Sequence, residues 1–177
     1  MRIPGLVLAL SLVTAPALAA GGDADLSGEA TIGPEGRHVT LRLTCDPAHA
    51  GLSAALTVPR YADLTARFDF GAFEGSSGTT KPLSALRIAG PNGVRSVIAA
   101  ASGAVAADPS TSFTLTVAAP RRSENPLRAV AAGFAQAGTR IVWTQSSPRP
   151  GDASVIATFT VNDPAPLRTA LEPCFGP

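Results

Sequence analysis

The side chains of Cys45, Asp46 and His49, with His38 on the preceding segment, are the nearest approach to a metal-binding set in this sequence. Thiolate and imidazole are ligands that copper favours. His38 and Cys45 are an odd number of residues apart on one predicted strand, so their side chains point to opposite faces. Met1 is the one methionine, and it lies in the predicted leader. We therefore expect no metal site and no cofactor.

Acid–base or nucleophilic catalysis would have to use residues scattered along the chain. Asp69 and Glu74 are the best-spaced pair of carboxylates, and His49 is one of two histidines. No G-x-S-x-G, H-E-x-x-H or S-x-x-K motif places a base beside a nucleophile. Isolated carboxylates are common on protein surfaces. The residues favour a non-catalytic protein, with a hydrolase assembled from Asp69, Glu74 and His49 as the alternative.

The two cysteines, Cys45 and Cys174, are best interpreted as a disulfide. Residues 37–45 alternate between polar and apolar side chains, which predicts a half-buried strand with Cys45 on its inner face. Near the other end, Leu167, Leu171 and Cys174 fall on one face at helical spacing. Both sulfur atoms are thus expected to face the core, and cysteines of exported chains commonly pair. A Cys45–Cys174 bridge would tie a terminal helix to an early strand.

Short alternating segments separated by glycine, proline and asparagine dominate the rest of the chain. The pair Asn92-Gly93 between two apolar runs is typical of a tight hairpin. A polar, glycine-containing loop is expected at 74–81. The pattern predicts strands at 26–32, 37–45, 52–58, 67–70, 83–89, 94–99, 112–117, 139–145 and 155–161.

Two short helices are also expected, at about 126–137 and 164–172. In the first, Asn125 is the predicted N-cap and Pro126 the first helical residue, with Leu127 and Phe134 on the apolar stripe. The second begins after Asp163 by the same reasoning, with Pro164 at its first position. Each helix is too short to be stable without packing against the strands.

These elements predict an all-β protein. Short strands with frequent turns and one polar face favour antiparallel pairing. We expect an antiparallel β-sandwich or flattened barrel of seven to nine short strands, with the two helices at its ends or edges. The alternative is an α+β protein with both helices on one face of a single antiparallel sheet.

The first residues have the pattern of a secretory signal peptide. Arg2 supplies a positive charge, an apolar run follows, and Ala17-Leu18-Ala19 matches a small-x-small cleavage site. A transmembrane anchor is the alternative, but the run is broken by proline and shorter than a bilayer requires. We expect a signal peptide at 1–19 and one disulfide-linked β domain at 20–177, with no membrane span in the mature chain.

Composition narrows the possible partners. The formal net charge of the whole chain is +1, and loss of Arg2 with the leader makes the mature chain neutral. A nucleic-acid-binding protein needs a strongly basic face to displace counterions from phosphates, so none is expected here. Aromatic residues are only 5% of the chain, which disfavours the exposed ring platforms on which carbohydrate-binding proteins depend.

Residues 159–174 form a last predicted strand, an L-x-x-A-L helix and a cysteine. This ending resembles those of small exported proteobacterial proteins, including accessory proteins of type VI secretion and invasion-associated periplasmic proteins. The resemblance implies a periplasmic or secreted protein of a Gram-negative bacterium, with its tail bonded to the domain. It covers less than a tenth of the chain and implies no particular activity.

The sequence therefore predicts an exported periplasmic or envelope protein that acts as a non-catalytic binding or interaction module. Its partner would be a protein or a small ligand, because polar loops on a rigid β scaffold usually carry binding. The hydrolase described above and a structural component of the envelope are the alternative functions.

Overall fold

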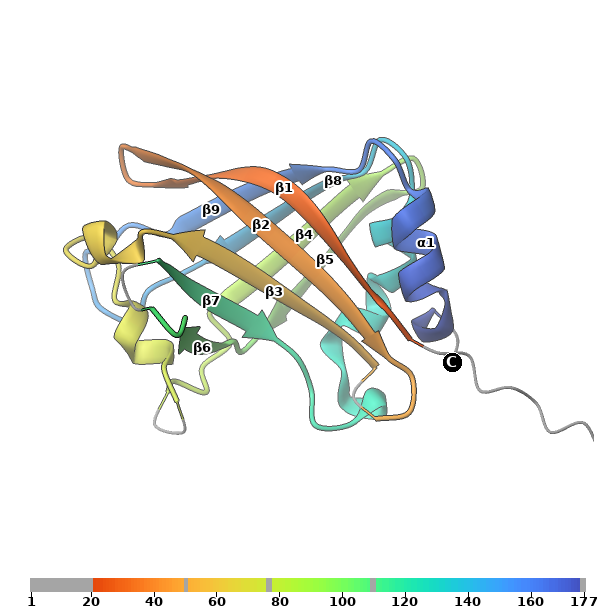
Figure 1. The fold of residues 1–177 in the computed structure, drawn as a ribbon, viewed down its shortest axis with the longest axis horizontal. Helices are drawn as coiled ribbons and strands as arrows, with labels where there is room; N and C mark the ends of the chain where they lie inside the picture. Colours follow the sequence, from red (N-terminus) through yellow and green to blue (C-terminus); the bar gives the residue numbers. More distant parts are fainter. Residues whose placement is uncertain (1–20, 50, 76–77, 109–110, 176–177) are drawn as a thin grey trace, which may run out of the picture.

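The computed structural model describes residues 21–49, 51–75, 78–108 and 111–175. Nine strands form one hydrogen-bonded sheet in the order β5-β4-β8-β9-β1-β2-β3-β7-β6 (Figure 1). Every pair of neighbouring strands is antiparallel. The strands are β1 Asp23–Ile32, β2 Glu35–Asp46, β3 Gly51–Pro59, β4 Ser84–Gly90, β5 Gly93–Ala99, β6 Ser102–Val105, β7 Ser112–Val117, β8 Arg140–Gln145 and β9 Val155–Thr160.

The sheet curls around its own inner face, so that β1, β2, β3 and β7 lie opposite β9, β8, β4 and β5 (Figure 1). The alternation predicted from the sequence sets which side chains turn inward. Leu41, Leu56 and Leu115 are fully buried, as are Ile141 and Trp143 from the opposite half. The antiparallel all-β prediction is thus confirmed. A two-sheet sandwich is not, because one continuous run of hydrogen bonds joins both halves.

The two edge strands are consecutive in the chain, separated only by Ala100 and Ala101. β5 pairs with β4, whereas β6 pairs with β7 at the opposite edge of the sheet. The segment therefore leaves one half of the curled sheet and joins the other. Gly103 allows this crossing, because a Cβ there would collide with the ring of Phe113 and the Cβ of Phe73.

Aromatic rings fill the part of the core next to the β5–β6 crossing. The segment between β3 and β4 contains two short 3₁₀ helices, η1 Tyr61–Leu64 and η2 Phe70–Phe73. Phe68 and Phe73 stack with ring centroids 5.7 Å apart. The strand predicted at 67–70 is therefore wrong: Phe68 and Phe70 are buried as expected, but from a turn and a 3₁₀ helix. A run of four residues cannot distinguish these conformations by periodicity.

The segment between β7 and β8 closes the other end of the curled sheet. It consists of the 3₁₀ helices η3 Arg122–Glu124, η4 Pro126–Ala129 and η5 Ala131–Ala135. Asn125 caps η4 as predicted, accepting a hydrogen bond from the Leu127 amide, and also donates to the carbonyl of Leu52 in β3. Leu127, Val130 and Phe134 are buried.

The α-helix predicted at 126–137 is not confirmed. The hydrogen bonds here join residues three positions apart, as in a 3₁₀ helix. The Val130 amide donates to the carbonyl of Leu127, and the Gly133 amide donates to the carbonyl of Val130. Successive short turns follow the concave end of the sheet, which a straight helix of that length would not. The apolar stripe is buried in either conformation, so the pattern predicted the buried face and not the helix type.

The one α-helix in the described residues is α1, Ala165–Leu171, within the predicted range 164–172. Leu167, Ala170 and Leu171 are buried against the end of the sheet. The short 3₁₀ helix η6, Glu172–Cys174, follows and brings Cys174 to β2. The predicted disulfide is present, with the α-carbons of Cys45 and Cys174 5.8 Å apart. It fits a protein that folds in an oxidising compartment.

The predicted signal peptide at 1–19 lies outside the described residues. Within them, every helix is too short or too polar to cross a lipid bilayer.

Candidate functional site

The cysteine and histidine residues considered as metal ligands do not gather. Cys45 is in the disulfide. His49 lies in the turn after β2, with its Nδ1 3.1 Å from a carboxylate oxygen of Asp46. His38 lies on the outer face of β2, beside Glu29 of β1. In the described ranges, no three side chains of His, Cys, Asp or Glu are grouped so that they could hold a metal ion.

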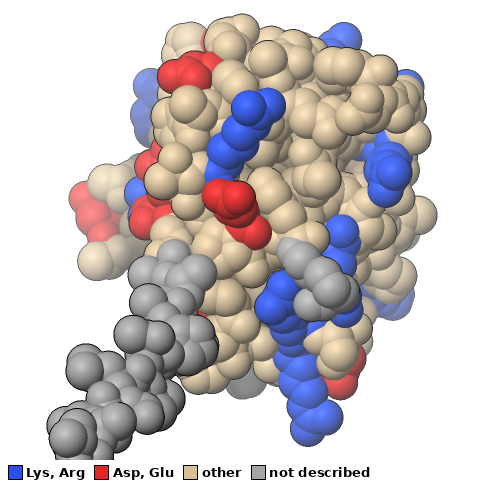
Figure 2. Space-filling view, turned by 90° about the vertical axis from the view of Figure 1, so that its right-hand side faces the viewer, with Lys and Arg blue, Asp and Glu red and all other residues tan. Residues whose placement is uncertain are grey.

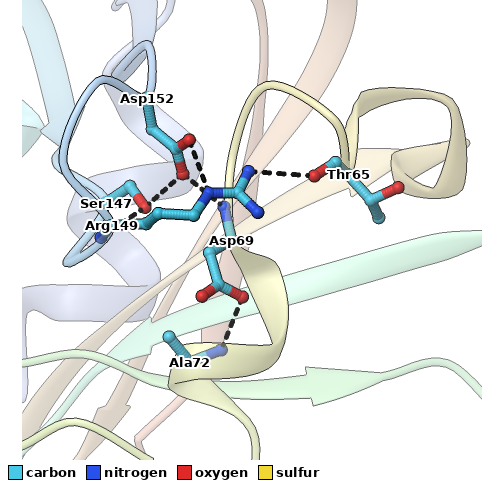
Figure 3. Close-up of polar contacts among 6 residues, drawn as sticks. All are labelled: Thr65, Asp69, Ala72, Ser147, Arg149 and Asp152. Atoms are coloured by element: carbon cyan, nitrogen blue, oxygen red, sulfur yellow. Dashed lines mark hydrogen bonds and ion pairs between the residues drawn. The ribbon is translucent and has the colours of Figure 1, made fainter.

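The three residues of the alternative hydrolase are not brought together either. Asp69 caps η2, where its carboxylate accepts a hydrogen bond of 3.3 Å from the Ala72 amide (Figure 3). Glu74 is exposed just after η2. His49 precedes β3, whereas Asp69 follows it, so a full strand of nine residues separates them. No base is therefore aligned with the two carboxylates.

Asp69 instead belongs to a polar cluster that joins two loops (Figure 3). The carboxylate of Asp152, in the β8–β9 loop, accepts hydrogen bonds from the Asp69 amide at 3.1 Å and the Ser147 hydroxyl at 2.6 Å. Arg149 donates to the same carboxylate at 2.7 Å and to the carbonyl of Thr65 at 3.2 Å. Every polar atom of the Asp152 carboxylate thus has a partner within the protein.

The protonation of Asp152 fits a structural role. Its side chain is only 7% exposed. Burial raises the pKa of this carboxyl, but the hydrogen bonds from Ser147 and Arg149, the charge of Arg149 and the Asp69 amide together outweigh burial and hold the pKa below its usual value. A carboxylate that is ionised and fully bonded does not act as an acid or base near neutral pH.

The best candidate for a functional surface is a groove at the end closed by α1. Its first part lies between the tip of the β4–β5 hairpin and the η4–η5 segment, with a volume of about 220 Å³. A second hollow of about 330 Å³ lies between η5 and α1. Ala132, Gln136 and Phe175 line both parts. The two hollows therefore form one elongated surface, which we call the arginine groove.

Three arginines from different elements line the arginine groove. Arg95 comes from β5 and Arg128 from η4, and both line the first part. Arg168 comes from α1 and lines the second part, where its Nε donates to the carbonyl of Ala135 at 3.0 Å. Arg95 donates to the carbonyl of Ala129 at 3.2 Å. These bonds to main-chain carbonyls hold two of the guanidinium groups in place without neutralising them.

The charge of the arginine groove is poorly compensated. Glu172 is the one acidic residue along it, in the second part. Among the described residues, none of the three arginines forms an ion pair, although Arg37, Arg42, Arg67, Arg121 and Arg149 do. Figure 2 looks at this end of the molecule and shows basic side chains spread over the right half of the view, with acidic ones mainly to the left.

This arrangement can bind an anionic group. Guanidinium groups donate several hydrogen bonds in a fixed plane that matches a carboxylate. The partly buried Phe175 and the exposed Ala129 and Ala132 offer apolar contact. The groove could not be predicted from the sequence, because its arginines are isolated at positions 95, 128 and 168 in three different elements. Only the packing of η4 against β5 and of η5 against α1 brings them to one surface.

No family model, curated protein or solved structure matches this chain. The protein is therefore described by its structure alone: it is an all-β, disulfide-linked domain with an elongated, arginine-lined surface at the end of a curled sheet.

Proposed function

We propose that this protein is an exported, non-catalytic binding module of the bacterial envelope, and that the arginine groove binds an acidic segment of a protein partner. The predicted signal peptide and the disulfide support the compartment. Among the residues that could have served a hydrolase, His49 lies on a separate segment from Asp69 and Glu74, and this supports binding over catalysis. Both the envelope location and the acidic protein partner are part of this proposal.

The observation that carries the proposal is the convergence of Arg95 and Arg128 on one hollow without a carboxylate partner in the described residues. Like charges brought together on a folded surface repel, so such a pair is more stable with an anion between its members. Charge-assisted hydrogen bonds from guanidinium to carboxylate are among the stronger polar contacts in proteins.

The shape favours an extended segment over a compact ligand. The two parts of the groove, at about 220 and 330 Å³, lie below or near the lower end of the roughly 300–1,000 Å³ typical of small-molecule pockets. The groove instead continues past Gln136 and Phe175 to Arg168. A peptide with two acidic side chains separated along its length would place one carboxylate in each part.

The proposal is tested by titrating residues 20–177 with a fluorescent peptide rich in Asp and Glu, and with a control peptide carrying Asn and Gln instead. We expect saturable binding of the acidic peptide only, weakening as salt is raised. Arg128→Gln removes one guanidinium contact and should weaken binding about five- to tenfold. The matched control is Arg60→Gln, because Arg60 follows β3 at the opposite end of the strand from the groove.

Equal binding of the two peptides contradicts the proposal. So does an Arg128→Gln variant that binds as tightly as the unchanged protein, or a loss of affinity in Arg60→Gln as large as that in Arg128→Gln. A melting temperature within a degree or two of the unchanged protein confirms that either variant is folded.

A further inference from the structure

A second surface, separate from the arginine groove, lies on the outer face of β5, β4, β8 and β9. Residues that face one another across antiparallel strands lie on the same side of the sheet. The register therefore places three rows side by side on this face: Ile98, Ala85, Thr144 and Ile156; Ser96, Arg87, Val142 and Thr158; and Val94, Ala89, Arg140 and Thr160. We call these residues the outer patch.

The outer patch carries the exposed large apolar side chains of the described residues. Ile98 is 67% exposed, Val94 55% and Ile156 44%. Ala85, Ala89 and Val142 between them are partly exposed. Thr144, Ser96 and Arg87 lie between these aliphatic side chains, so the face combines apolar and polar contacts. Exposed aliphatic side chains grouped on one face of a sheet are unfavourable in water and often mark a contact surface.

The charge of the outer patch has one sign. β4, β5, β8 and β9 contain three arginines, Arg87, Arg95 and Arg140, and no Asp or Glu. Arg87 and Arg140 belong to the patch and form no ion pair in the part of the chain that the structure describes. By contrast, β1 and β2 contain Asp23, Asp25, Glu29, Glu35 and Asp46. The acidic residues of the sheet are thus confined to its other half.

This combination restricts what can cover the outer patch. A second copy of the chain, related by a twofold axis, would bring arginines against arginines with no carboxylate between them. A partner that covers the outer patch must therefore present a surface that is both aliphatic and anionic. The interface of a phospholipid bilayer with anionic headgroups meets both requirements, because acyl chains accept Val and Ile while phosphates pair with guanidinium groups.

We propose that the outer patch docks the protein on the surface of an anionic phospholipid membrane. Val94, Ile98 and Ile156 enter the boundary between headgroups and acyl chains. Arg87, in the middle row, and Arg140, in the same row as Val94, contact the headgroup phosphates. No segment crosses the bilayer in this arrangement, and the arginine groove stays free because it lies at the end of the sheet rather than on this face.

The experiment measures co-sedimentation of residues 20–177 with vesicles of phosphatidylcholine alone and of phosphatidylcholine with about 30% phosphatidylglycerol. We expect binding to the anionic vesicles only, decreasing with salt. Each arginine near an anionic surface contributes about a fivefold change in partitioning, so Arg87→Gln with Arg140→Gln should weaken binding about 25-fold. Ile98→Ser should weaken it as well, through lost burial of aliphatic surface.

The matched control is Arg42→Gln with Arg60→Gln, which removes the same charge elsewhere: Arg42 lies on the outer face of β2, paired with Asp25. These changes, and Arg128→Gln in the groove, should alter vesicle binding less than twofold. No binding to anionic vesicles overturns the inference, whether or not an acidic protein binds this face. An equal loss in the control pair also overturns it. Because Arg128→Gln is the variant that tests the groove, the two proposals can fail separately.

Discussion

At the scale of single residues, Asp152 links two loops that are far apart in the chain. Its carboxylate joins the Asp69 amide, the Ser147 hydroxyl and Arg149. Nothing in the local sequence distinguishes Asp152 from the other carboxylates, because its partners include a main-chain amide 83 residues away. The polarity of the turn at 146–152 was predictable, and the role of this residue in joining the loops was not.

The lowered pKa of Asp152 predicts a pH dependence of stability. A group whose pKa is lower in the folded than in the unfolded chain stabilises the fold above its unfolded pKa, and this contribution is lost as pH falls through the folded pKa. We expect Asp152→Asn to melt at a lower temperature than the unchanged protein at pH 6–7. The difference should shrink below about pH 4, near the ordinary aspartate pKa.

Thermal melts followed by circular dichroism between pH 3 and 7 would measure this. Glu74→Gln is the control, because the exposed Glu74 forms no ion pair among the described residues. A difference between Asp152→Asn and the unchanged protein that stays constant over the whole pH range would contradict the assignment.

At the scale of elements, α1 is held to the sheet by both packing and a covalent bond. Its buried residues could be predicted because the spacing of Leu167, Leu171 and Cys174 left one inward face. The 3₁₀ segments at 122–135 show the limit of the same reasoning. Asn125, Pro126 and the apolar stripe fit either helix type, and contact with the curved end of the sheet decides between them.

Removing the disulfide should destabilise the protein strongly. The bridge closes a loop of 129 residues, for which restriction of the unfolded chain corresponds to about 5 kcal/mol. Native disulfides in small domains typically contribute about 2–5 kcal/mol. We expect the double variant Cys45→Ala, Cys174→Ala to unfold at a clearly lower urea concentration, as followed by the fluorescence of the buried Trp143.

Reduction of the unchanged protein should shift the urea midpoint in the same direction, whereas the double variant should not respond to the reductant. An unchanged midpoint in the double variant would mean that packing of α1 alone holds the end of the sheet.

At the scale of the whole molecule, the strand order was beyond prediction. Alternation identified most strands and their inner faces, but register between distant strands depends on contacts that one sequence does not display. β1 pairs with β9, and β4 with β8, so neighbours in the sheet come from segments far apart in the chain. The surfaces proposed for binding follow from this order, since each combines residues from separate elements.

The order of strands predicts how the sheet opens. β9, β1 and β2 lie in the interior of the sheet, paired on both sides, whereas β5 and β6 are its edges. Hydrogen exchange should therefore be slowest at amides such as those of Ala157 and Leu41, and faster by orders of magnitude at Ile98 and Ala104. Exchange measured by mass spectrometry with peptide resolution would show this. Equal protection in edge and interior strands would argue against a sheet that ends at β5 and β6.

The pairing of β1 with β9 also affects how a newly made chain acquires this shape. β1, the first of the described strands to leave the ribosome, lacks one of its two partners until β9, the last of them, has been made, and Cys174 follows β9. The sheet therefore stays incomplete through most of synthesis. The disulfide forms only after all the described strands have been made, so an interrupted chain lacks both the crosslink and Phe175 of the groove.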